Sequence, residues 1–156
     1  MLVTGLPSRR GVLQAAAAGP LLLLAACSSD GGEQTPDADD AVRSDVSASE
    51  QRLLARYDAT IAAFPALAGK LQPIRDQHAE HLAAMGSQPT NRDDNGPAVG
   101  KTPAGAISDL TAAERSAATE RVKASGQASS AELIWNLALI AASESQHATA
   151  LARGSA

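Results

Sequence analysis

The stretch "SAELIWNLALIAASESQHATALA", residues 130–152, decides the fold. Its large aliphatic residues are spaced for a period of 3.6, which places them on one face of a helix: Leu133, Leu137, Ile140 and Leu151. Ser129 and Glu132 stand three apart before the apolar run, as in a capping box, and mark the helix start. The stretch therefore predicts an amphipathic helix over residues 130–152, with Trp135 off this face and packing near a helix end.

Three further segments share this composition, which is rich in alanine and leucine and lacks the alternation typical of strands. They predict helices over residues 46–64, 66–85 and 108–125. Pro65 separates the first two, Pro73 predicts a kink in the second because proline removes a helical hydrogen bond, and Gly126 ends the third. The expected apolar faces are Val46, Leu53, Leu54, Tyr57, Ile61 and Phe64, then Leu67, Leu71, Ile74 and Met85, then Ile107, Leu110 and Ala117.

Four amphipathic helices in two hairpins predict an all-α, antiparallel four-helix bundle. The 156 residues suit one domain, expected over residues 46–152 with a long loop at 86–106. The chain has one Phe, one Tyr and one Trp, so the core must be aliphatic. Alanine lets helices approach each other closely, toward the lower end of the usual range of about 8–10 Å between axes.

Residues 1–26 are expected to be an export signal in front of this domain. Arg9 and Arg10 precede an apolar run that ends at "LAAC", residues 24–27, and the run is too short for a permanent membrane span. "LAAC" resembles a bacterial lipobox, which implies that lipoprotein-processing enzymes remove residues 1–26 and that Cys27 carries lipid. "SRRGVLQ", residues 8–14, resembles the twin-arginine export motif, and an ordinary export signal is the alternative.

The small, acidic residues 27–45 are expected to form a flexible tether. This arrangement predicts an extracytoplasmic protein held at the cell membrane by its lipid. Removing residues 1–26 takes away two of 13 Lys and Arg residues and none of the 17 Asp and Glu residues, which leaves a net charge of about −6. A chain so acidic has no nucleic-acid-binding patch, and its single cysteine allows no internal disulfide.

Five polar residues continue the helical spacing of the apolar faces and are therefore expected to point inward: Glu50, His78, His81, Glu144 and His147. All three histidines of the chain are in this set. Imidazoles with one or two carboxylates suit zinc, copper or iron better than magnesium or calcium, which prefer oxygen ligands. The alternative is a buried hydrogen-bonded network of the same residues without metal.

Three stretches carry a family resemblance: "EQRLLARYDATIAAFPAL" (50–67), "QHAEHLAAMG" (77–86) and "IAASESQHATAL" (140–151). The chain is similar to actinobacterial exported lipoproteins with a small ferritin-like four-helix domain of unassigned function. A di-iron site of the ferritin-like type implies Glu on the first and third helices and Glu-x-x-His on the second and fourth. Glu50, Glu144 and His147 match this pattern, whereas His78 stands where the pattern has a glutamate.

On the third helix, Glu114 and Glu120 are the candidates for the matching carboxylate. Glu114 is the less favoured ligand, because it also fits a capping box with Thr111.

The relative heights of two pairs of polar residues along the bundle depend on the order of the helices. His78 and His81 lie past the middle of the second predicted helix, and Glu144 and His147 lie past the middle of the fourth. They share a level if the helices run up, down, up and down. In the crossed order, up, down, down and up, they stand on the order of 10 Å apart at 1.5 Å per residue unless the hairpins slide.

The sequence thus predicts a membrane-anchored extracytoplasmic lipoprotein whose ferritin-like bundle binds a transition metal between its helices. The alternative function is a metal-free structural or interaction module for another envelope protein. No Ser/His/Asp set and no phosphate-binding loop favours a hydrolase or a kinase. An enzyme is therefore the less favoured class.

Overall fold

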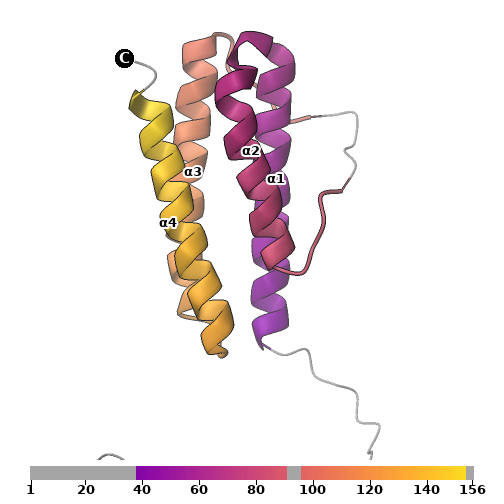
Figure 1. Cartoon of the computed structure of the whole chain (residues 1–156), viewed down its shortest axis with the longest axis vertical. Helices are drawn as coiled ribbons and strands as arrows, with labels where there is room; N and C mark the ends of the chain where they lie inside the picture. Colours follow the sequence, from indigo (N-terminus) through magenta and orange to yellow (C-terminus); the bar gives the residue numbers. More distant parts are fainter. Residues whose placement is uncertain (1–37, 91–95, 154–156) are drawn as a thin grey trace, which may run out of the picture. The chain divides into compact units, whose positions relative to one another are not determined.

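The computed structural model describes residues 38–90 and 96–153, which are all-helical and contain no strand (Figure 1). The elements are α1 (Ala38–Ala63), the short 3-10 helix η1 (Pro65–Leu67), α2 (Ala68–Ala84), α3 (Pro103–Ser125) and α4 (Ala131–Arg153). The predicted all-α class is therefore confirmed for these ranges. No helix within them combines the length and the hydropathy needed to cross a bilayer. The predicted signal peptide, with Arg9 and Arg10, the lipidation site Cys27 and the first part of the tether lie outside the described residues.

The helix α1 begins eight residues before its predicted start, so the prediction of a tether over residues 38–45 is wrong. Val42 is buried one turn before Val46 and extends the apolar face of α1. The carboxylate of Asp39 accepts hydrogen bonds from the backbone N–H groups of Ser129 (2.6 Å) and Ser130 (3.0 Å). These groups precede α4, so contacts far along the chain stabilise the first turn of α1.

The start of α4 differs by one residue from the prediction. Ser130, rather than Ser129, caps the helix, because its Oγ accepts the backbone N–H of Leu133 at 3.3 Å. The helix therefore begins at Ala131.

The start of α3 differs by five residues. Pro103 is its first residue, and the preceding Thr102 accepts the N–H of Gly105 at 3.1 Å. Thr111 consequently lies two turns inside the helix, where its hydroxyl donates to the carbonyl of Ile107 at 2.8 Å. The predicted capping box at Thr111 is wrong.

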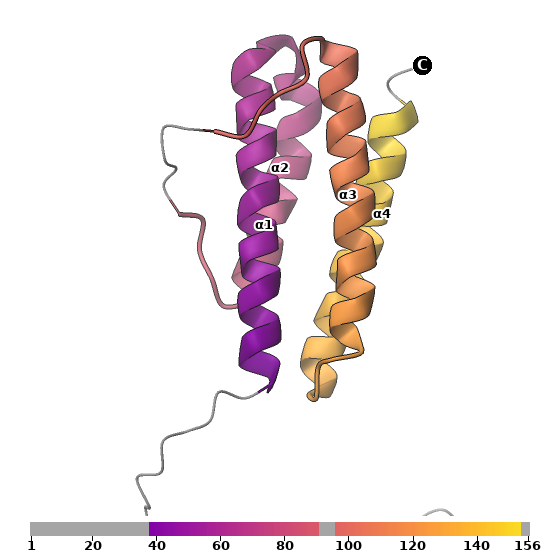
Figure 2. The ribbon, with the colours of Figure 1, turned by 180° about the vertical axis from the view of Figure 1, so that it is seen from behind.

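The described parts of the connection between α2 and α3 contact α1 at two points. The side chain of Gln51 donates to the carbonyl of Gln88 at 2.7 Å, and further along the chain Gly96 lies beside Ala59. Figure 2 shows that this connection returns to the end of the bundle where α2 began, and that α3 starts there. The starts of α2 and α3 therefore share one end with the C-terminal ends of α1 and α4.

The apolar core contains two clusters, one toward each end of the bundle. The lower cluster, named from its place in Figure 1, contains Val42, Val46, Met85, Leu133, Leu137 and Ile140. The upper cluster contains Tyr57, Leu71, Ile74, Ile107, Leu110 and Leu151. All but Val42 belong to the predicted apolar faces, which these clusters confirm. The upper cluster contains residues of all four helices. The lower cluster joins α1 and α4 with Met85, which directly follows α2. The two clusters therefore hold the four helices together.

Trp135 does not pack near a helix end as predicted. Its side chain is 66% exposed, beside the exposed Leu139 and Ile134 of α4. The prediction placed Trp135 off the buried face correctly, but this position points to solvent.

Candidate metal centre

A layer of buried polar side chains lies between the lower and upper clusters and is drawn from all four helices. We call it the polar layer; it contains Glu50 of α1, His78 and His81 of α2, Glu114 and Arg121 of α3, and Glu144 and His147 of α4. The five residues predicted as ligands are thus brought together. Glu114, the less favoured candidate, is fully buried among them, whereas Glu120 is exposed outside the layer.

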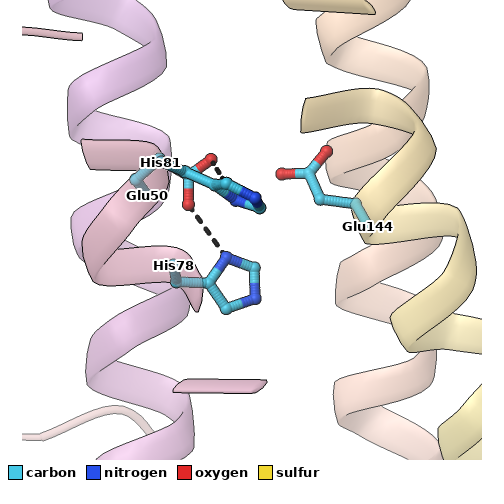
Figure 3. Close-up of side chains that lie close together, drawn as sticks. All are labelled: Glu50, His78, His81 and Glu144. Carbon is cyan, nitrogen blue, oxygen red and sulfur yellow. Dashed lines mark hydrogen bonds and ion pairs between the residues drawn. The ribbon is translucent and has the colours of Figure 1, made fainter. Parts of the chain in front are cut away.

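On one side of the layer, Glu50 lies between the two histidines of α2. Its Oε2 is 2.9 Å from Nδ1 of His78, and its Oε1 is 3.7 Å from Nδ1 of His81. Figure 3 shows these three side chains together, with Glu144 pointing toward them from α4. The helical spacing of 78 and 81 brings both rings to the same carboxylate.

On the other side, the same His78 ring meets Glu114. Its Nε2 is 2.8 Å from Oε1 of Glu114, an oxygen that also accepts the hydroxyl of Tyr57. Both ring nitrogens of His78 therefore face carboxylates, one from α1 and one from α3. His78 is completely buried, so water does not compete for either contact.

His147 reaches this second carboxylate with a defined nitrogen. Its Nε2 lies 3.0 Å from Oε1 of Gln77 and 3.2 Å from Oγ of Ser143. An amide oxygen only accepts, so this contact assigns the proton to Nε2. In the neutral ring, Nδ1 then keeps its lone pair and faces Oε2 of Glu114 at 3.5 Å. An outer hydrogen bond that fixes the tautomer in this way is typical of metal-binding histidines.

Arg121 supplies the only fixed positive charge of the layer. Its Nη2 donates to Ser49 at 3.1 Å and to Oε1 of Glu50 at 3.2 Å, and it lies 3.2 Å from Oε1 of Glu144. The guanidinium thus links carboxylates from α1 and α4. A single arginine faces three buried carboxylates, so the layer carries an excess of negative charge.

The carboxylates respond to this environment in two ways. Burial raises the pKa of both Glu50 and Glu114, but hydrogen bonds from histidines outweigh it. The pKa of Glu50 falls well below its usual range through His78, His81 and the charge of Arg121. The pKa of Glu114 falls to about 2 through His147, His78 and Tyr57.

Glu144 behaves in the opposite way. Burial, together with the negative charges of Glu50 and Glu114, raises the pKa of Glu144 to about 8 even though Arg121 is near. Burial lowers the pKa of His78, but its hydrogen bonds to Glu114 and Glu50 outweigh this and raise it to about 9. In the metal-free protein, protons on these two groups therefore offset the two negative charges that Arg121 leaves unbalanced.

Six buried side-chain atoms within the described residues have no hydrogen-bond partner: Nδ1 of His81 and His147, Oε2 of Glu114, both Oε atoms of Glu144, and Nε of Arg121. A buried polar atom without a partner costs about 1–3 kcal/mol. Five of the six are nitrogen or oxygen atoms of a type that binds metal ions. They belong to two groups whose ligand atoms lie within 4.8 Å of one another: Glu50, His78, His81 and Glu144, and His78, Glu114 and His147.

These residues fit a transition metal. Zinc binds histidine nitrogen and carboxylate oxygen at about 2.0–2.2 Å, so small side-chain movements bring each group around one ion. The mixed nitrogen and oxygen donors suit zinc, copper or iron.

The observed heights of the pairs His78/His81 and Glu144/His147 differ from the expectation for the crossed helix order. The crossed order was expected to separate them, yet His147 of α4 contacts Gln77 of α2 at 3.0 Å, and Lys70 near the start of α2 reaches the carbonyl of Leu151 at 3.4 Å. The expectation assumed that the middles of α2 and α4 lie level. The contacts show instead that α2 lies nearer the upper end and α4 nearer the lower end, so the hairpins are shifted.

Two members of the layer were missed or undervalued. Leu110, Glu114, Ala117 and Arg121 follow one another at intervals of four, three and four, which is the spacing of a buried face. The predicted site did not include Arg121, because a guanidinium does not bind metal ions. The spacing alone contained the signal for both residues.

Searches with this chain find no matching family model, no matching curated protein and no matching solved structure.

Proposed function

We propose that this protein binds a transition metal ion in the polar layer of a ferritin-like, antiparallel four-helix bundle. Ferritin-like bundles have one long crossover connection. They place a glutamate from each of two helices beside a Glu-x-x-His motif from each of the other two. The crossover between α2 and α3 supports this assignment. So do the positions of Glu50, Glu114 and the pair Glu144 and His147.

One observation carries the proposal, namely the five nitrogen and oxygen atoms without a hydrogen-bond partner that converge in the layer. Nδ1 of His147 and Oε2 of Glu114 face each other at 3.5 Å, and both are acceptors when Nε2 of His147 carries the proton. Two buried acceptors repel unless a proton or a metal ion stands between them. A metal ion supplies that charge and satisfies both atoms.

Metal analysis tests the proposal. The untagged full-length protein is expected to retain at least one zinc, copper or iron ion per chain after purification, and Glu144→Gln is expected to lose metal. Glu132→Gln is the matched control, because Glu132 is an exposed glutamate on the same helix. Metal well below one equivalent in the wild type, or equal metal in both variants, argues against the site.

We also propose that the bundle is a lipoprotein, held outside the cytoplasm at the cell membrane through Cys27 and exported by way of Arg9 and Arg10. The "LAAC" sequence at residues 24–27 supports this. Cys27→Ala is expected to move the protein from the membrane fraction to the soluble fraction. Unchanged fractionation contradicts the anchor and leaves the metal site untouched.

A second candidate function is a metal-free interaction module for another envelope protein. The exposed Trp135, Leu139 and Ile134 on α4 favour it, because aromatic and aliphatic side chains are frequent anchors in interfaces. Under this alternative, one protein co-purifies in stoichiometric amount from solubilised membranes, and Trp135→Ala releases it. Metal analysis of the same preparation separates the two functions.

A further inference from the structure

We propose that the polar layer binds two metal ions and that the imidazole ring of His78 bridges them. This inference rests on the proposed metal-binding function and adds the number of ions and the bridging group. The bridge differs from a carboxylate-bridged pair, because a histidine occupies the shared position.

The two ligand groups lie on opposite sides of one ring. The first group contains Glu50, His78, His81 and Glu144, and the second contains His78, Glu114 and His147. His78 is the one residue common to both. The first group unites α1, α2 and α4, and the second unites α2, α3 and α4.

The orientation of the His78 ring shows whether the two ligand groups use different ring nitrogens or compete for the same one. Nδ1 faces Glu50 of the first group at 2.9 Å, while Nε2 faces Glu114 of the second group at 2.8 Å. Each group therefore has its own nitrogen, and one ion does not exclude the other. In the metal-free state each of these short contacts needs a proton on the ring nitrogen, because carboxylate oxygens only accept.

Each ion takes the place of one ring proton. Binding of two ions turns the protonated ring into an imidazolate, whose two nitrogens donate one electron pair to each ion. It releases the two ring protons and the proton of Glu144 to solvent. The ring itself stays where it is, since Tyr57, His81 and His147 surround it with ring centroids 5.2–5.4 Å away.

The unpartnered atoms divide between the two groups as two ions require. Nδ1 of His81 and both oxygens of Glu144 belong to the first group. Oε2 of Glu114 and Nδ1 of His147 belong to the second group. A single ion in either group leaves the other set of atoms buried without a partner.

Two divalent ions also match the charge of their ligands. Three carboxylates and one imidazolate carry four negative charges, which two divalent ions neutralise. The guanidinium of Arg121, which contacts Glu50 and Glu144 and also donates to Ser49, stays in the layer as one further positive charge.

Copper(II) titration with electron paramagnetic resonance tests the bridge. We expect the wild-type protein to bind two copper(II) ions per chain with little paramagnetic signal at low temperature, because an imidazolate couples the spins of the two ions. The measurements use full-length protein stripped of metal, and Cys27→Ser serves as background because a thiol reduces copper.

Variants of each group separate the contributions. His81→Ala is expected to leave one ion in the second group, and His147→Ala one ion in the first, each with the full signal of one isolated spin. His78→Gln keeps the volume of the side chain but lacks the second ring nitrogen, and is expected to lose the coupling. Far-ultraviolet circular dichroism of each variant controls for folding.

The outcomes distinguish this inference from the function beneath it. One copper ion per chain in the wild type overturns the paired site and leaves the proposed function intact. Two ions with the full signal of two isolated spins overturn the bridge. No bound metal under any loading condition overturns both.

Discussion

The apolar ends of this bundle and its polar middle are built from the same four helices with the same helical spacing, yet they are held together differently. At the ends, Leu133 and Leu137 or Ile107 and Leu110 bury hydrocarbon, which stabilises by about 1.5–3 kcal/mol per side chain. In the middle, the spacing continues through Glu144. The helical spacing that buries leucine at the ends of the bundle buries a carboxyl group in its middle.

The difference teaches where stability and function separate in a small domain. A buried charge network rarely stabilises a fold more than well-packed hydrocarbon does. The polar layer interrupts the core between two clusters that could otherwise be continuous. Five of its nitrogen and oxygen atoms lack a hydrogen-bond partner, and the proposed metal ion would give the layer a role that hydrocarbon cannot fill.

Removal of Arg121 should break the middle most severely. We expect Arg121→Ala to destabilise the metal-free protein by about 3–5 kcal/mol, because it leaves Glu50 and Glu144 buried without their cation. Urea unfolding in the presence of a chelator measures this loss. Added zinc should restore part of it by supplying positive charge, and a loss below about 1 kcal/mol contradicts the assigned role.

A cavity in the lower cluster should lower the free energy of unfolding without affecting the polar layer. Leu137→Ala is expected to cost about 3 kcal/mol, within the usual range of about 2–5 for a buried leucine, because Leu137 is completely buried. The cost should be equal with and without zinc, provided that zinc binds only the folded state. A difference between the two conditions indicates that the lower cluster and the polar layer are coupled.

Leu137 and Arg121 also illustrate what could and could not be predicted from the sequence. Period alone identified both clusters and five members of the layer, because the spacing at Leu137 and at Glu144 is the same. Glu114 was undervalued, since its position three residues after Thr111 imitates a capping box. The sequence predicts which residues face inward, but the shift between the hairpins depends on packing across the bundle. The early start of α1 depends on Asp39 and its partners 90 residues away.

The pH dependence of the metal-free protein should expose Glu144. Its pKa is raised from 4.5 to about 8 on folding, so the contribution of Glu144 to stability is complete below about pH 4.5 and is lost as pH rises toward 8. Between about pH 5 and pH 6.5 we expect a loss of about 1–3 kcal/mol in wild type and a flatter profile in Glu144→Gln. Chemical unfolding in a chelator at several pH values measures both. Parallel profiles contradict the assignment to Glu144.

The smallest effect is expected at an apolar side chain outside either cluster. Trp135→Ala should change the free energy of unfolding by less than about 0.5 kcal/mol, because the indole is mostly exposed. Thermal unfolding of the isolated protein tests this, with Leu137→Ala as the buried comparison on the same helix. A larger loss means that Trp135 is covered in solution.

The crossover between α2 and α3 has a consequence for the order of folding. Contacts within each hairpin join residues near in sequence, such as Asp58 and Arg75, whereas Glu50 and Arg121 are 71 residues apart. Loop-closure entropy makes such distant contacts slow to form, so the hairpins should assemble before they dock. The proposed metal ligands come from both hairpins and converge only at docking. A metal ion should therefore slow the undocking of the two hairpins far more than it speeds the formation of either one.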